Sequence, residues 1–191
     1  MRNVELTTRT TNRNRGLSEV VSTLILLVVA VLLAAVVAYY ATNVTMTRTS
    51  QEEVRLSKQH VWVNSSGAVA AVKVQNLGGR DILIDKLSVR SIDADWDQIY
   101  YYRVPSGSSV NEDQNLTSYA SLTGAVVLID GRNYTQATSD LPLISGGELL
   151  VYVKGPQNIQ MDDIGTTVSM SVTTNNAQYI TEVNVKSASS Q

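Results

Sequence analysis

The chain has 191 residues, enough for one compact domain and an additional segment, because typical domains contain roughly 100–200 residues. Its 15 basic and 17 acidic residues give a formal net charge of −2, which argues against a nucleic-acid-binding protein. It has no cysteine, so disulfides, thiolate metal clusters and a lipid anchor on an N-terminal cysteine are excluded.

The first 16 residues form a polar, basic leader. Glu5 is the only acidic residue in this leader, and the basic residues are Arg2, Arg9, Arg13 and Arg15. Basic segments next to an apolar run stay on the cytoplasmic side of a membrane. We therefore expect the leader to remain cytoplasmic.

An uncharged apolar run follows the leader. Residues 24–41 read LILLVVAVLLAAVVAYYA, and with residues 20–23 the run reaches 22 residues without a charge, Gly or Pro. As a helix it is about 33 Å long, enough to span the bilayer core. The eleven Leu, Ile and Val residues of 24–41 favour insertion by roughly 3–7 kcal/mol. Glu19 lies in the first turn, where the interface and the helix dipole favour a carboxylate.

Two ordinary interpretations of this run are a permanent membrane anchor and a secretory signal peptide. The pattern Val36-x-Ala38 allows a general signal peptidase to cut before Tyr39. The apolar run is long for such a signal, however, and Tyr39 and Tyr40 have the character of an interfacial aromatic anchor. The sequence therefore favours retention of the helix over its removal.

The junction between leader and apolar run reads RNRGLSE over residues 13–19, with basic residues and a glycine before the run. Together with RGLSEVVSTL over residues 15–24, it resembles the class III signal of archaeal type IV pilins. It is less similar to archaellins, where a glycine-bearing segment follows the cut. It differs from the pilins in having Asn14 where a basic residue is usual. Its acid would be third in the mature chain, not fifth as in bacterial pilins.

This resemblance implies that a class III signal peptidase cuts between Gly16 and Leu17 and leaves the helix on the mature chain. It implies a precursor inserted in the cytoplasmic membrane and then an extracellular adhesion filament at the cell surface, a helical homopolymer of this chain. The implied partners are further copies of the chain, a pilus assembly ATPase and a platform protein. The alternatives are a membrane-anchored sandwich module that binds a sugar or surface ligand without polymerising, and an archaellin.

The apolar helix carries small residues at a helical spacing. Ala30, Ala34 and Ala38 recur every fourth residue, which places them near one face of the helix. In lipid, apolar helices associate through close packing of such small residues. A helix that is apolar on every face is stable only in a bilayer or among other helices. We expect the alanines to form the close-approach face of a filament core and Glu19 to set the register.

The segment after the apolar run is less regular. Four threonines between residues 42 and 49 predict a bend or weak point, whereas residues 50–56 allow two further helical turns as a stalk.

The predicted organisation is a leader (1–16), a helix and stalk (17–58) and a head (59–191). The fold class is α+β, with a long N-terminal helix and an all-β, immunoglobulin-like sandwich.

Short β-branched and aromatic runs separated by turn residues predict the strands of the head. The predicted strands are 61–64, 68–75, 82–91, 98–104, 125–129, 148–154, 167–173 and 179–186. Alternation over 72–75 and 168–173 predicts sheets with one apolar and one wet face. The polar stretch from Pro105 to Gly124 is expected to be a surface excursion.

The sequence offers little for catalysis, and we expect no enzyme activity, no cofactor and no metal. His60, the single histidine, is expected on the surface. Asp93, Asp95 and Asp97 alternate as in a calcium loop, but Gln98 and Val104 stand where an EF-hand requires Gly and Glu. A looser calcium site is left open. The run Tyr100-Tyr101-Tyr102 with Trp96 either stacks on sugars or packs across the sheet.

Four glycosylation sequons begin at Asn43, Asn64, Asn115 and Asn133. In an exported protein each is an acceptor for glycan. We expect Asn115 and Asn133, in predicted surface loops, to be preferred over Asn43, which is close to the membrane or the filament core.

Overall fold

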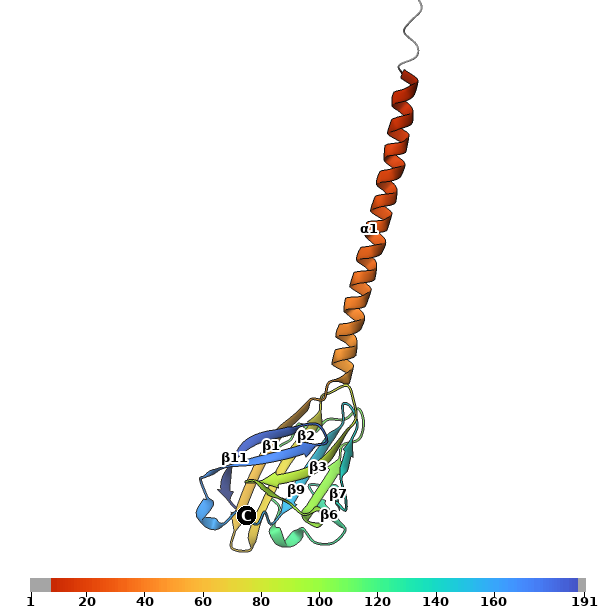
Figure 1. Ribbon diagram of the computed structural model, residues 1–191. Helices are drawn as coiled ribbons and strands as arrows, with labels where there is room; N and C mark the ends of the chain where they lie inside the picture. The colour runs from red at the N-terminus through yellow and green to blue at the C-terminus, as the bar shows by residue number, and fades with distance from the viewer. Residues whose placement is uncertain (1–7, 189–191) are drawn as a thin grey trace, which may run out of the picture. The chain divides into compact units, whose positions relative to one another are not determined.

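The computed structural model describes residues 8–188, and describes side chains at residues 16–47 and 51–188. The chain divides into two compact units, Met1–Arg48 and Thr49–Gln191, which are described separately below. The α+β class is confirmed, because one long N-terminal apolar helix precedes a β-rich domain (Figure 1).

The helix α1 (Thr8–Ser50) is continuous through the threonine-rich segment where a bend was expected. The hydroxyls of Thr42, Thr45 and Thr47 donate to carbonyls four residues earlier, at 2.8, 2.9 and 2.9 Å. These bonds occupy the hydroxyls within the helix, so they do not interrupt its backbone ladder. The stalk helix through Leu56 does not form, because residues 51–53 have no regular structure and a strand begins at Val54.

The β-rich domain contains every strand that the sequence predicted. Short 3-10 turns η1 (Trp96–Gln98), η2 (Tyr119–Ser121) and η3 (Met161–Asp163) lie between strands. Three further strands were missed, because β4 (Ile92–Asp93) and β8 (Leu141–Leu143) are very short and β7 (Arg132–Gln136) is mostly polar. The strands are β1 (Val54–Asn64), β2 (Gly67–Asn76), β3 (Ile82–Val89), β4 (Ile92–Asp93), β5 (Ile99–Arg103), β6 (Val126–Ile129), β7 (Arg132–Gln136), β8 (Leu141–Leu143), β9 (Glu148–Lys154), β10 (Thr167–Thr174) and β11 (Gln178–Ser187).

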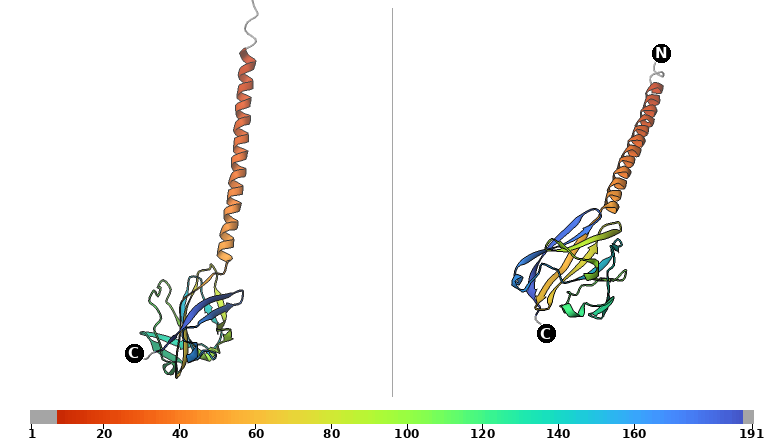
Figure 2. Two further views of the ribbon diagram at one scale, coloured as in Figure 1. Left: turned by 90° about the vertical axis from the view of Figure 1, so that its left-hand side faces the viewer. Right: turned by 60° about the horizontal axis from the view of Figure 1, so that its bottom comes forward.

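These strands form one curled sheet in the order β4-β3-β10-β11-β1-β2-β9-β5-β7-β6, with β8 also paired to β3. All the pairs are antiparallel except β1 with β11, which run parallel and pair only between residues 61–63 and 185–187. The curl produces a sandwich of two layers, whose strands can be followed in Figure 2. We call β1, β2, β9, β5, β7 and β6 layer A, and β4, β3, β10, β11 and β8 layer B.

An aliphatic core fills the space between the layers. It is built from alternate residues of the central strands, among them Val61, Val72, Ile84, Val151 and Val172. Each of these side chains is at most 1% exposed. Alternation over 72–75 and 168–173 therefore predicted the inward face of β2 and β10 correctly.

The other face of layer A is also covered, contrary to the predicted wet face. A second cluster containing Trp62, Tyr100, Leu122, Tyr134 and Tyr152 packs against it. The stretch 105–124, expected to be a surface excursion, crosses this face and contributes the fully buried Leu122. The wet face predicted for this sheet was therefore wrong, because segment 105–124 covers it, although most residues of that segment are exposed as expected.

Candidate functional site

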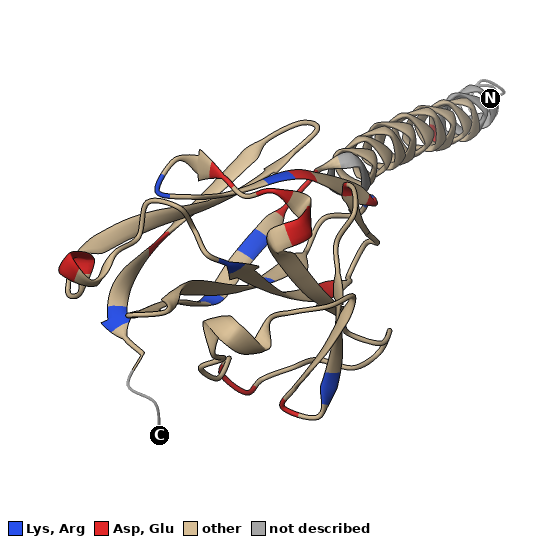
Figure 3. Cartoon of the chain, turned by 90° about the horizontal axis from the view of Figure 1, so that it is seen from below, with Lys and Arg blue, Asp and Glu red and all other residues tan. Residues whose placement is uncertain are grey.

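The helix presents an unbroken apolar surface. Its segment Gly16–Thr47 is long and apolar enough to cross a membrane, and none of it is buried within the chain. Leu26, Leu27 and Val28, which as consecutive residues point about 100° apart around the helix axis, are 68, 61 and 53% exposed. Among residues 16–47, where the helix side chains are described, Glu19 is the one charged residue, and most of this part of the helix is tan in Figure 3. The described helix therefore leaves all its apolar faces available to lipid or to other helices.

The residues predicted to serve processing and assembly all lie in α1 and are exposed: Gly16, Leu17, Glu19, Ala30, Ala34 and Ala38. With 3.6 residues per turn, Glu19, Ala30 and Ala34 lie within about 60° of one another around the helix axis. The bond between Gly16 and Leu17 lies inside the helix, so a peptidase must unwind that turn to reach it. A Cβ at Gly16 would meet no atom within 4 Å, so the helix itself does not require glycine there.

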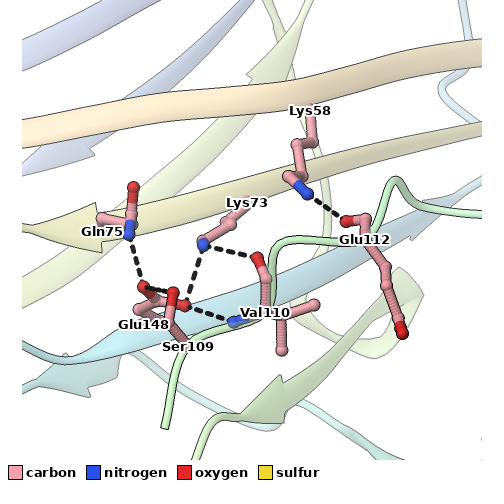
Figure 4. A network of polar contacts seen from close by, with 7 residues as sticks. All are labelled: Lys58, Lys73, Gln75, Ser109, Val110, Glu112 and Glu148. Atoms are coloured by element: carbon pink, nitrogen blue, oxygen red, sulfur yellow. Dashed lines mark hydrogen bonds and ion pairs between the residues drawn. The ribbon is translucent and has the colours of Figure 1, made fainter.

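In the head, the most elaborate polar site fastens a segment that we call the strap, residues 105–118, onto layer A. Lys73 Nζ lies 2.8 Å from Glu148 Oε2 and donates to the carbonyl of Val110, also at 2.8 Å. The two charged side chains are only 4 and 9% exposed. Figure 4 shows that they come from neighbouring strands and meet beneath the strap.

The Glu148 carboxylate accepts three further hydrogen bonds. Ser109 Oγ donates at 2.8 Å, the backbone N–H of Val110 at 3.1 Å, and Gln75 Nε2 also donates (Figure 4). Burial alone raises the pKa of a carboxyl, but these bonds and Lys73 outweigh it and lower the pKa of Glu148 to about 2. The Glu148 carboxylate is therefore a satisfied structural anchor and carries no proton at neutral pH.

His60 is a second anchor of the strap, and its side chain, expected on the surface, is 14% exposed. Its ring stacks on Trp62 with centroids 5.0 Å apart, and its Nε2 atom lies 2.8 Å from Asp113 Oδ1. The hydrogen bond from His60 lowers the pKa of Asp113. Lys58 donates to the carbonyl of Glu112, whose carboxylate lies 2.9 Å from Arg132 Nη2.

The tyrosines of β5 pack within the domain, so cross-sheet packing accounts for them. Tyr100 is buried and donates to the carbonyl of Leu122 at 3.2 Å. Tyr102 lies against Tyr134, whose ring meets that of Tyr152 edge-on at 5.2 Å. Burial raises the pKa of Tyr134 to about 12 and also raises that of Tyr152.

The alternating aspartates do not converge on one point. Asp93 accepts from Ser88 Oγ at 2.6 Å and lies 3.7 Å from Lys86 Nζ, whereas Asp97 lies in η1. Among the residues that the structure describes, no group of three His, Cys, Asp or Glu side chains could hold a metal ion.

Residues 51–53, which follow the helix, are held in place by hydrogen bonds from the head. The sequence did not predict these contacts. The carbonyl of Glu53 accepts from the backbone N–H groups of Leu77 and Gly78 at 2.8 and 3.1 Å. The Glu52 carboxylate accepts from Asn176 Nδ2 at 2.8 Å and from the hydroxyl of Thr174. A Cβ at Gly78 would lie 2.6 Å from the carbonyl oxygen of Gln51, so this close passage requires glycine.

The four sequons lie in different surroundings. Asn43 is in α1, Asn64 ends β1, Asn115 is in the strap, and Asn133 is in β7 instead of the predicted loop. Asn43, Asn115 and Asn133 are exposed, and Asn64 is half-buried.

Compared with known proteins, the sequence matches no family model and no curated protein.

Proposed function

We propose that this chain is the precursor of a structural subunit of an extracellular, type IV pilus-like adhesion filament. The proposal rests on one observation about the segment Gly16–Thr47. This segment is apolar on every side, and none of it is buried against the rest of its own chain. Such a helix is stable only where lipid or other helices cover all its faces. A filament core of parallel copies provides that cover outside the membrane.

The position of the leader supports this function over simple anchoring. Arg13, Arg15 and Gly16 precede the apolar run, so a cut after Gly16 removes the basic residues and retains the helix. The mature chain then begins at Leu17 and has Glu19 as the single charge in its first turns. Small side chains at Ala30, Ala34 and Ala38 allow neighbouring helices to approach closely.

The head has the properties expected of the outer part of such a subunit. Its two buried clusters give it a core of its own, and its polar groups anchor the strap. Its role in the proposal is to coat the fibre and present the adhesive surface. The resemblance of residues 13–24 to archaeal type IV pilins adds the expected partners: a class III signal peptidase, an assembly ATPase and a platform protein.

Mass spectrometry of protein sheared from native cells tests the proposal most directly. We expect an N-terminal peptide that begins at Leu17, recovered from fibres that sediment without detergent. A start at Tyr39 contradicts helix retention, and a start at Met1 contradicts processing.

Two substitutions at the cleavage site refine this test. Gly16→Ile places a branched side chain before the scissile bond and is expected to block cleavage and filament formation. Gly16→Ala is the matched control, because the helix has room for a methyl group there. Normal processing of the Ile variant would contradict the predicted cut. Glu19→Ala is expected to be cleaved normally but to assemble poorly, and an unchanged fibre yield would remove Glu19 from the assembly model.

A membrane-anchored binding module is the second candidate, favoured by the same uncovered helix. It predicts that the protein stays with the cells on shearing and requires detergent for release. Recovery of the protein in sheared fibres would exclude it.

A further inference from the structure

The strand β6 forms a free edge of layer A. It is the last strand in the sheet order and, among the residues that the structure describes, pairs only with β7. Its outward side chains, Val126 and Leu128, are 56 and 69% exposed, and residues 124–129 carry no charge. An apolar edge strand of this kind pairs with other chains unless something blocks it. No charged side chain of β6 itself performs that role.

Asn133 lies directly across from this apolar edge. In the ladder of β6 and β7, Asn133 faces Leu128 and Thr135 faces Val126. Side chains in such opposed pairs share one face of the sheet, with Cβ atoms about 4.5–5.5 Å apart. Both Asn133 and Thr135 are exposed, so the acceptor amide and the hydroxyl of this sequon open onto the same surface as the two apolar side chains.

The other sequons are less available. The Asn64 side chain accepts from the backbone N–H groups of Ser66 and Gly67 at 2.9 and 3.2 Å, which fixes it in a turn. In the strap, Thr117 of the Asn115 sequon is buried, and the Asn115 carbonyl accepts from the Tyr152 hydroxyl at 2.8 Å. Asn43 lies in the apolar helix. The Asn133 sequon is the one whose acceptor and hydroxyl are both exposed on the head.

The geometry points to Asn133 as the site of an N-linked glycan that covers Val126 and Leu128 and prevents pairing at the β6 edge. A bulky, hydrated glycan on the neighbouring strand blocks pairing with another chain, as charged residues do on other edge strands. The inference rests on the export step of the proposed function, because it requires the head to reach a glycosylating compartment.

The chemistry is a glycosyl transfer without oxidation or reduction. The donor is an oligosaccharide linked through phosphate to a membrane lipid. A bond forms between Asn133 Nδ2 and the anomeric carbon of the first sugar while the bond from that carbon to the phosphate oxygen breaks. The lipid phosphate leaves, and the amide proton passes to a basic group of the transferase.

Peptide mass spectrometry of the full-length protein from native cells tests the site. Cleavage after acidic residues separates the sequons, because Asn133 falls in peptide 131–140 and Asn115 in peptide 114–130. We expect peptide 131–140 to carry the mass of a glycan, which Asn133→Gln and Thr135→Ala abolish and Thr135→Ser retains. An unmodified peptide 131–140 in the wild-type protein would overturn the inference.

The shielding role has its own measurement. In sedimentation of the full chain in detergent, Asn133→Gln is expected to self-associate more strongly than wild type, and Leu128→Lys in the same chain is expected to reverse this. Asn115→Gln is the control and should sediment as wild type. Unchanged sedimentation of Asn133→Gln would overturn the shielding. Fibres with an unmodified peptide 131–140 contradict this inference alone, whereas glycosylated protein that never forms fibres contradicts the proposed function alone.

Discussion

The helix and the head use similar apolar residues in opposite ways. In α1 every described residue from 16 to 47 is exposed, including long runs of Leu and Val. In the head, Val61 and Val151 are fully buried between two layers. The head therefore buries its central apolar side chains within one chain, whereas the described helix buries none of its own. This difference supports the proposed division of roles. The head folds around its own core, and the helix serves membrane insertion or filament assembly.

The largest expected effects come from a charge placed in the core of the head, which opposes folding, or in the helix, which opposes membrane insertion. Val151→Asp puts an unpaired carboxylate between the layers, at a position with no exposure, and should cost at least about 3–5 kcal/mol and prevent folding of the head. Circular dichroism of the full chain in detergent measures it.

Leu32→Asp is the matched change in the helix, where Leu32 is 60% exposed. It should leave the free energy of unfolding of the head within about 0.5 kcal/mol of wild type. It should instead oppose membrane insertion by roughly 3 kcal/mol. Loss of head stability in this variant would contradict the division of roles.

Breaking the anchor of the strap should rank next. Glu148→Ala leaves Lys73 buried without its partner, which should lower the free energy of unfolding by about 3–5 kcal/mol. Lys86→Ala is the control, because its pair with Asp93 is long, at 3.7 Å, and exposed, and should contribute about 0–1 kcal/mol. Denaturant unfolding of both variants measures the difference, and equal losses would show that burial of the anchor is unimportant.

Acid should weaken the head through the same carboxylate. The pKa of Glu148 is about 2 in the folded protein, against an ordinary value of 4.5. A depressed folded pKa stabilises the fold above the ordinary value, and this contribution disappears as pH falls from 4.5 towards 2. For this nearly buried group it is on the order of 3 kcal/mol. Unfolding curves over that pH range should show a loss of unfolding free energy in the wild type and a smaller loss in Glu148→Gln. If the free energy of unfolding falls equally with pH in both proteins, other carboxyls are responsible for the acid sensitivity.

The smallest effect concerns the segment that joins the two regions. Gly78→Ala pushes a methyl group against the backbone of Gln51 and Glu53, which should cost about 1–3 kcal/mol. Hydrogen exchange at the amides of Leu77 and Gly78, which bind the Glu53 carbonyl, should become faster. Gly107→Ala strains only its own backbone in open space and should leave this exchange unchanged. Unchanged hydrogen exchange in both variants would mean that the hydrogen bonds to the Glu53 carbonyl tolerate the added methyl group.

Local sequence patterns predicted most of the fold. The uncharged run at 20–41 predicted the helix, and short β-branched and aromatic runs between turn residues predicted eight of the strands, since both signals depend on residues that are close in the chain. The missed strands β4, β7 and β8 are short or polar and form because neighbouring strands pair with them. For the predicted site, the sequence placed Glu19 and the alanines on a helix, whereas Gly16, assigned to the leader before the helix, lies inside α1. The roles of these residues in processing and assembly stay predictions.

Tertiary structure alone decided which polar groups are buried. Nothing near Lys73 in the sequence indicates that Glu148 will meet it, or that the polar strap will cover both. In the same way, His60 joins Trp62 and Asp113. Composition and periodicity decide whether a segment becomes helix or strand, because those energies are local. The cover over a sheet face depends on contacts between distant segments, which form only when the whole sheet has closed.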